Sequence, residues 1–170
     1  MPTPNAVALY TATIFQHRDR YLLLQRASAK RLAPNRWTGI GGRVEPDEWN
    51  DLRAAALREL REEIGLTERD ITHFVLRRVL FHNRINEPIT TLLYFTGTLA
   101  EAITPKCTEG ALRWLTPEQM AAVDIIETTR AALPLLMQDL ARDPLGQEPV
   151  RLGLADYRGE ALAQVLWGGL

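Results

Sequence analysis

The alternation of hydrophobic and polar residues along the chain predicts five β-strands and three helices. Runs rich in β-branched and aromatic residues predict strands over residues 6–15, 20–26, 70–82, 88–99 and 111–115. Turns are expected at 16–19 and 83–87, and a loop at 27–36. Helices are predicted over 51–64 and 128–140, and a short helix begins at Pro117. This order predicts an α/β fold, in which helices cover both faces of a mixed β-sheet as an α/β/α sandwich.

The helix predicted over residues 51–64 carries the most informative pattern of the chain. It contains no Gly or Pro, and Gly65 follows it in the position of a C′ glycine. At about 100° per residue, one apolar stripe is formed by Leu57, Leu60 and Ile64. Another side of the same helix carries Glu59, Glu62 and Glu63. Because Glu59 and Glu63 are like charges four residues apart, these acids do not stabilise the helix, and they suit a hard divalent cation such as Mg²⁺.

Length and composition place the chain among ordinary globular proteins. It has 170 residues, of which 46% are hydrophobic and 24% charged, and its net charge is −1. We expect one domain over residues 1–140, followed by an extension over 141–170 whose Leu, Val and Trp content argues against simple disorder. The extension packs either on the domain or on a second copy of the chain, as in a homodimer. The near-zero charge gives no bias toward a nucleic-acid polymer or a membrane.

Positive charge is concentrated in the first quarter of the chain. Positions 17–43 hold seven Lys or Arg residues against one acid, Asp19. A basic loop beside an acidic helix suits a metal-bound polyphosphate, and a solubilising surface loop is the alternative. The candidates for substrate binding are Arg26, Lys30, Arg31, Arg36 and Arg43.

The single cysteine, Cys107, excludes an internal disulfide and fits a reducing compartment. No apolar run approaches the length of a membrane span, and no charged-then-apolar segment stands at the N-terminus. We therefore expect a cytoplasmic protein.

The segment from Gly41 to Leu66 resembles the signature of the Nudix hydrolases, G-x5-E-x7-R-E-U-x-E-E-x-G-U, where U is aliphatic. Gly42 and Glu48 match its opening. Its close is matched by Arg58, Glu59, Leu60, Glu62, Glu63, Gly65 and Leu66. Nine residues separate Glu48 from Arg58 where the family has seven, so we place a two-residue insertion after Glu48. The resemblance covers about residues 6–140 and implies the same sandwich fold.

The resemblance also implies a metal-dependent hydrolase. Glu59, Glu62 and Glu63 would be metal ligands, with the Gly41 carbonyl as a further oxygen. Arg58 would orient the glutamates, while Glu48 and Gly42 would support the site from the loop. For the general base it leaves two candidates, Glu59 and Glu109. The implied cofactor is Mg²⁺, with Mn²⁺ as an alternative.

The expected substrate class depends on residues that are absent from the segment after the signature. Residues typical of enzymes acting on ADP-ribose or dinucleoside polyphosphates are replaced by Phe81, His82, Asn83 and Arg84. We therefore expect hydrolysis of nucleoside di- or triphosphates. Two alternatives remain: an isopentenyl-diphosphate-isomerase-like enzyme, which residues 22–39 resemble but whose cysteine is replaced by Gly39–Gly42, and a non-catalytic nucleotide sensor. Trp37, Phe81 and Tyr94 are candidates for stacking on a base.

Overall fold

A computed structural model describes residues 7–84, 87–102 and 105–168. The strands are β1 (Val7–His17), β2 (Arg20–Arg26), β3 (Trp37–Thr38), β4 (Ile71–His82), β5 (Ile89–Leu99), β6 (Gly110–Leu115), β7 (Arg151–Arg158) and β8 (Ala161–Gly168). The helices are α1 (Leu52–Ile64), α2 (Pro117–Ala121) and α3 (Glu127–Arg142), with 3₁₀ turns η1 (Pro46–Glu48) and η2 (Glu68–Asp70). Ala6 of the first predicted strand, residues 85–86 of the predicted turn, and residues 169–170 lie outside the described residues.

All eight strands join one mixed sheet in the order β3-β2-β1-β5-β4-β7-β8, with β6 paired to β2. The pairings β1–β5 and β4–β7 are parallel, while β1–β2, β2–β6, β4–β5 and β7–β8 are antiparallel. The mixed sheet predicted from the sequence is thereby confirmed.

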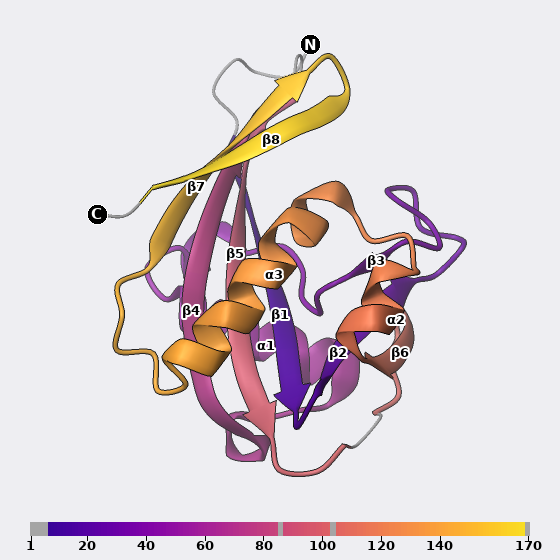
Figure 1. The fold of residues 1–170 in the computed structure, drawn as a ribbon, viewed down its shortest axis with the longest axis vertical. Helices are drawn as coiled ribbons and strands as arrows, with labels where there is room; N and C mark the ends of the chain where they lie inside the picture. Colours follow the sequence, from indigo (N-terminus) through magenta and orange to yellow (C-terminus); the bar gives the residue numbers. More distant parts are fainter. Residues whose placement is uncertain (1–6, 85–86, 103–104, 169–170) are drawn as a thin grey trace.

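One helix covers each face of the sheet (Figure 1). Leu60 and Ile64 of α1 pack in one core cluster with Phe15 of β1 and Phe95 of β5. Leu133, Leu136 and Leu140 of α3 pack in a second cluster on the opposite face, against Ile14, Leu80 and Tyr94. Successive side chains of a strand point to opposite faces of the sheet, so one strand contributes residues to both clusters. The predicted α/β/α sandwich is confirmed.

The sequence analysis missed three strands, β3, β7 and β8. The last two form a hairpin whose turn holds Gly159 at φ 65°, and β7 continues the sheet beside β4 with Leu80 opposite Gly153. In Figure 1 this hairpin projects at the top of the view, away from α1. The domain boundary at residue 140 stays a prediction. Within the described residues, no helix is long and apolar enough to cross a membrane.

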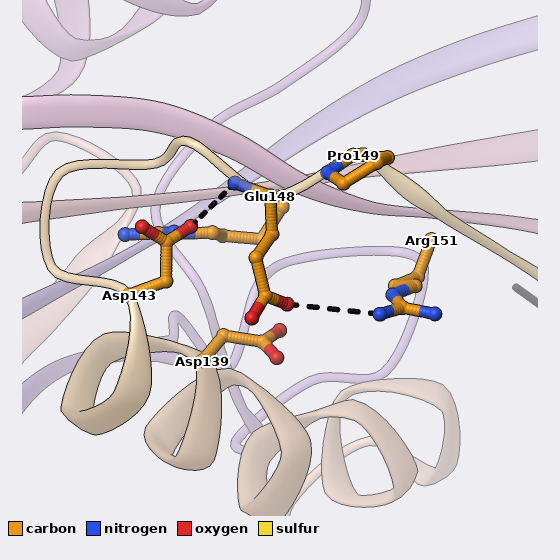
Figure 2. Close-up of a pocket in the computed structure, with 6 residues that line it drawn as sticks. Asp139, Asp143, Glu148, Pro149 and Arg151 are labelled. Carbon is orange, nitrogen blue, oxygen red and sulfur yellow. Dashed lines mark hydrogen bonds and ion pairs between the residues drawn. The ribbon is translucent and has the colours of Figure 1, made fainter.

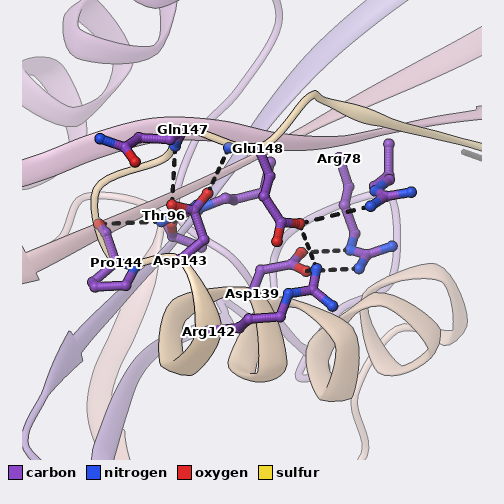
Figure 3. Close-up of polar contacts among 10 residues, drawn as sticks. Arg78, Thr96, Asp139, Arg142, Asp143, Pro144, Gln147 and Glu148 are labelled. Carbon is purple, nitrogen blue, oxygen red and sulfur yellow. Dashed lines mark hydrogen bonds and ion pairs between the residues drawn. The ribbon is translucent and has the colours of Figure 1, made fainter. Parts of the chain in front are cut away.

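A buried network of arginines and acids fastens the connection between α3 and β7 to the sheet (Figure 3). A β-bulge in β4 between Leu76 and Arg78 interrupts the alternation of side chains, and both Arg77 and Arg78 reach the end of α3 and the segment after it. Arg78 forms a bidentate pair with Asp139 of α3, at 2.7 and 2.9 Å. Arg77 contacts Asp143 at 3.1 Å and donates to the Thr96 hydroxyl at 3.0 Å.

The same network also holds the segment that follows α3. Asp143 accepts hydrogen bonds from the backbone of Gln147 and Glu148, and Arg142 pairs with Glu148. The pocket among these side chains has a volume of about 10 Å³, roughly the space of one water (Figure 2). The Arg78 guanidinium also lies 5.0 Å from the centre of the Trp167 ring, which links the network to β8.

Candidate active site

Local signals fix helix α1 at both ends, and the C-terminal signal at Gly65 was predicted. The Asp51 side chain accepts a hydrogen bond from the Ala54 N–H at 2.9 Å, which caps the N-terminus. Gly65 adopts the left-handed conformation at φ 71° and closes the C-terminus through its N–H to the Arg61 carbonyl. Because Leu60 and Ile64 are buried against the sheet, Glu59, Glu62 and Glu63 stand on the sides of the helix that face the neighbouring loops.

Arg58 joins the loop before α1 to two of the three glutamates. Its Nε and Nη2 donate to Glu48 at 2.5 and 2.9 Å, and its Nη1 lies 2.9 Å from both Glu59 and Glu62. The Arg43 carbonyl accepts a further hydrogen bond from Arg58 Nη2. These contacts raise the pKa of Arg58, and the same hydrogen bonds lower the pKa of Glu48. The inserted loop therefore brings Glu48 to Arg58 in spite of its extra length.

Glu63 is the most perturbed acid of the site. Burial raises its pKa to about 7, with further contributions from the nearby charges of Glu59 and Glu109. A hydrogen bond from the Gly41 backbone and the charge of Lys30 act in the opposite direction. Its Oε2 is buried and has no hydrogen-bond partner among the described residues. A buried carboxylate oxygen without a partner is costly unless a ligand supplies one.

The paired glycines bring the loop backbone against these acids. A Cβ atom on Gly42 would lie 2.5 Å from Glu59 Oε2, so any other residue there would displace the Glu59 carboxylate. Gly41 has φ 144°, and a Cβ there would lie 2.6 Å from the Thr11 carbonyl oxygen. Thr11 also accepts the Gly42 N–H at its hydroxyl, at 3.3 Å. No local pattern predicts a role for this threonine, because that role depends on where β1 passes the loop.

Two further loops approach α1 from the side of Glu63. Lys30 of the basic loop forms an ion pair with Glu109, which precedes β6. The Thr108 N–H donates to the Glu63 carbonyl at 3.2 Å, so the Glu109 segment is held at the helix. Cys107 lies in the same segment, where burial raises the pKa of its thiol and the charge of Glu63 adds to the shift. The structure thus brings Glu109 and Lys30 to the α1 acids.

The predicted phosphate-binding residues divide into two groups. Arg36 is fully engaged: it contacts Asp124, the Ile125 carbonyl and Glu127, and so ties β3 to the start of α3. Arg26 donates to the Leu32 carbonyl at 2.9 Å within the basic loop. By contrast, the side chains of Arg31 and Arg43 are exposed.

Within the contacts described above, five acids share two cations, although α1 itself also carries Arg53 and Arg61. Glu48, Glu59, Glu62, Glu63 and Glu109 stand against Arg58 and Lys30. Within the described residues, no group of three or more His, Cys, Asp or Glu side chains is placed to hold a metal ion, and Arg58 draws Glu59 and Glu62 toward itself. The surplus acid and the unpartnered Glu63 oxygen nevertheless fit a divalent cation, which takes carboxylate oxygens as ligands.

The aromatic candidates for base stacking are mostly core residues. Trp37 is 4% exposed and Tyr94 is fully buried, whereas Phe81 is half-buried. A cavity of about 580 Å³ lies elsewhere, between α2 and α3, and is lined mainly by apolar side chains such as Met120, Ile125 and Leu133. The lining of this cavity contains no acid that could bind a cation, in contrast to the surroundings of α1.

Comparison with known proteins agrees with the geometry. A family model described as the NUDIX domain matches residues 4–136. The m7GpppN-mRNA hydrolase NUDT17 of Homo sapiens is 33% identical over 165 residues, covering 87% of this chain and 50% of that protein. The isopentenyl-diphosphate Delta-isomerase of Saccharopolyspora erythraea is 40% identical over 73 residues, covering 42% of this chain and 36% of that protein. The chain thus spans half or less of the length of these two relatives.

Among solved structures, the mutator MutT protein from Bacillus halodurans has a TM-score of 0.64 at 20% identity. The alignment covers 94% of this chain and 97% of that one. At this identity the likeness concerns the fold.

Proposed function

We propose that this chain, which belongs to the Nudix family of hydrolases, cleaves the diphosphate linkage of nucleoside di- or triphosphates. The reaction would depend on Mg²⁺. The products would be a nucleoside monophosphate and phosphate or pyrophosphate. Nudix hydrolases generally use divalent metal ions, and Mn²⁺ is the alternative to Mg²⁺. The observation that carries the proposal is the buried, unpartnered oxygen of Glu63 among surplus acids.

Glu59, Glu62 and Glu63 would hold the metal, with the Gly41 carbonyl as a further oxygen. A bound divalent cation neutralises diphosphate charge and lowers the pKa of a water molecule. Arg58 would orient Glu59 and Glu62 through the contacts that it already makes, and Glu48 would hold Arg58 from the loop. Gly42 would let the loop backbone approach Glu59.

Proton transfer and phosphate binding use the surrounding loops. Glu59 and Glu109 remain the candidates for the general base, since either could take a proton from a water molecule that attacks phosphorus. Burial raises the pKa of Glu59, which makes its carboxylate a stronger base. For the phosphates we favour Arg31 and Arg43, whose side chains are exposed, over Arg26, Lys30 and Arg36, because the latter three already hold backbone or acidic partners.

A capped dinucleotide is a second candidate substrate. The human relative is named for hydrolysis of m7GpppN-mRNA, and its similarity covers 87% of this chain. The bond cleaved would again be a diphosphate linkage, so the same acids would serve. The isomerase and sensor alternatives predict different products, or none.

The test is a substrate panel assayed with Mg²⁺, with Mn²⁺ and with EDTA. It holds all ribo- and deoxyribonucleoside di- and triphosphates, ADP-ribose, dinucleoside polyphosphates, nucleotide sugars, m7GpppN and isopentenyl diphosphate. We expect metal-dependent release of a nucleoside monophosphate from one nucleotide group. Glu62→Gln should abolish it, while Glu160→Gln, an exposed acid in the β7–β8 turn, should not.

Three results would contradict the proposal. Isomerised isopentenyl diphosphate would point to the isomerase class. Nucleotide binding without turnover by the folded protein would point to the sensor. Turnover that persists unchanged in EDTA would remove the metal from the mechanism.

A further inference from the structure

The apolar cavity between α2 and α3 has the size and lining of a binding site for a small molecule. Its volume is about 580 Å³. Four of the side chains that line it, Tyr21, Met120, Ile125 and Leu133, are buried members of the core cluster on the α3 face of the sheet. Small-molecule sites have volumes of this order and are lined mainly by apolar side chains, with a few polar groups that orient the ligand.

Helix α3 forms one long wall of this cavity. Leu133, Pro134 and Met137 line it, and their three- and four-residue spacing places them on one face of the helix. Arg130 stands on the same face before them, and Gln138 follows them. Arg130 and Gln138 are eight residues apart in the sequence, which is about 12 Å along a helix. The wall therefore runs from a cation at Arg130, through apolar side chains, to an amide at Gln138.

Arg130 is the only charged residue among the described residues that line the cavity. Its Nη2 donates to the Val123 carbonyl at 2.6 Å, and within the described part of the chain no acid forms an ion pair with it. The two acids nearest to it along the chain, Asp124 and Glu127, are both held by Arg36. A guanidinium carries several N–H donors, so Arg130 keeps donors for a ligand while the contact to Val123 holds it in place.

The charge of Arg130 selects the head group of the ligand. A carboxylate there would form a charge-assisted pair with the guanidinium and would meet no acid in the lining. A cationic head group would be repelled by Arg130. The apolar wall selects the rest of the ligand, because an apolar body is needed to displace water from Leu133, Pro134 and Met137.

We propose that this cavity binds a fatty acid, with the carboxylate at Arg130 and the apolar chain along Leu133, Pro134 and Met137. The complementary charge at one end and the apolar wall beside it together define this class of ligand. The cavity and the α1 acids lie on opposite faces of the sheet, so this site does not depend on the proposed function.

The test compares a matched set of probes at concentrations where each is monomeric. Decanoate has both the chain and the carboxylate, decanol has a neutral head group, decylammonium has a positive one, and acetate has no chain. Two of the three methionines of the chain, Met120 and Met137, line the cavity, so ¹³C-methyl labelling of methionine reports binding at this site. We expect decanoate to shift both signals and to saturate at one molecule per chain. Decanol and decylammonium should bind at least about tenfold more weakly, and acetate should not bind.

Variants of Arg130 separate the effect of charge from that of the apolar wall. Arg130→Gln should weaken decanoate binding about tenfold and leave decanol binding unchanged. Arg130→Glu should reverse the preference, so that decylammonium binds more tightly than decanoate. Arg69→Gln and Arg69→Glu are the matched controls, because Arg69 is an exposed arginine of η2, and they should bind the probes as wild type does.

A second kind of variant fills the cavity and keeps its charge. Ala121 is an exposed residue of α2 that lines the cavity, and Ala121→Trp should weaken decanoate and decanol alike. Circular dichroism and thermal melting verify that each variant is folded. The proposal is overturned if decanoate gives no saturable shift of the Met120 and Met137 signals, or if the three probes with a chain bind equally. Wild-type affinity of Arg130→Gln for decanoate would also overturn it.

Discussion

Two clusters of arginine and carboxylate stand on opposite faces of the sheet and differ in balance. Around α3, Arg77 and Arg78 each meet one aspartate, and the contacts in Figure 3 satisfy both acids. Around α1, Arg58 alone serves Glu48, Glu59 and Glu62, while Glu63 keeps an unpartnered oxygen. The first cluster is complete by itself. We propose that an added cation completes the second.

The difference separates structural from functional charge. A buried pair whose partners match holds two elements in register, and removing one partner leaves an uncompensated charge. Acids without matching cations destabilise the folded state, and proteins retain them where ligand binding or catalysis uses them. The predictions below test this distinction through activity and stability together.

The largest expected effect is on catalysis at the unbalanced cluster. Glu63→Gln should lower kcat/KM for the nucleotide substrate by about 1000-fold, because several kcal/mol of metal-assisted stabilisation are lost. Steady-state kinetics with Mg²⁺ measures it, with Glu101→Gln, an exposed acid after β5, as control. A loss below tenfold would show that Glu63 is not part of the site.

At the balanced cluster the expected effect is on stability. Asp139→Asn leaves Arg78 buried without its countercharge and should lower the free energy of unfolding by about 3 kcal/mol. Urea denaturation measures this change, and kcat at a temperature where the variant is folded should stay close to wild type. A variant that is fully stable but inactive would reverse the roles assigned to the two clusters.

A pH experiment on metal-free protein sharpens the comparison. The pKa of Glu63 is raised to about 7 in the folded state. At a pH below the ordinary pKa of a glutamate, its carboxyl is protonated in both the folded and the unfolded states, so it costs the folded state no stability. As pH rises from 4.5 to about 7, the folded state should lose stability, and above that range the loss is complete. We expect Glu63→Gln to be more stable than wild type by about 2 kcal/mol at pH 8 in EDTA, allowing for solvent screening.

The same comparison at pH 4 should give no difference, because the carboxyl is then protonated in both states. Saturating Mg²⁺ at pH 8 should reverse the order and make the wild type more stable, since only its full set of acids binds the cation. Equal stability of the two proteins at pH 8 in EDTA would contradict the raised pKa.

The smallest effect is expected at the exposed rim of the α3 cluster. Arg142 is 57% exposed at its side chain and pairs with Glu148. Arg142→Ala should change the free energy of unfolding by less than about 1 kcal/mol, because exposed ion pairs are screened by solvent. Raising the salt concentration should shrink even this difference. A larger loss would mean that the rim and the buried pairs act as one unit.

The fold was predictable where local signals decide it. Helix α1 begins after the Asp51 cap and ends at Gly65, and both signals are present in the sequence. The hairpin β7–β8 was missed because Gly153 interrupts the alternation of β7, while Pro149 and Gly159 stand just outside its two ends. Its position is set by pairing with β4, a contact that no local pattern of residues 141–170 reveals.

The acids of the site were named from the sequence, but their state was not predictable. Whether Glu63 is charged depends on its burial and on Glu109, which a different loop brings to it. The bulge that turns both Arg77 and Arg78 toward the end of α3 and the segment after it also lies beyond sequence patterns. Residue identity and helical spacing give the candidates, and tertiary contacts decide their protonation.

Contact between Glu48 and Arg58 closes the intervening residues into a loop. Six of the nine residues between Glu48 and Arg58 belong to helix α1, so the extra length falls in the short segment before the helix. The bidentate contact holds the two ends together. The length of this segment can therefore vary while the geometry at its ends is retained. A search for related proteins should require the contact between the glutamate and the arginine, and not a fixed number of residues between them.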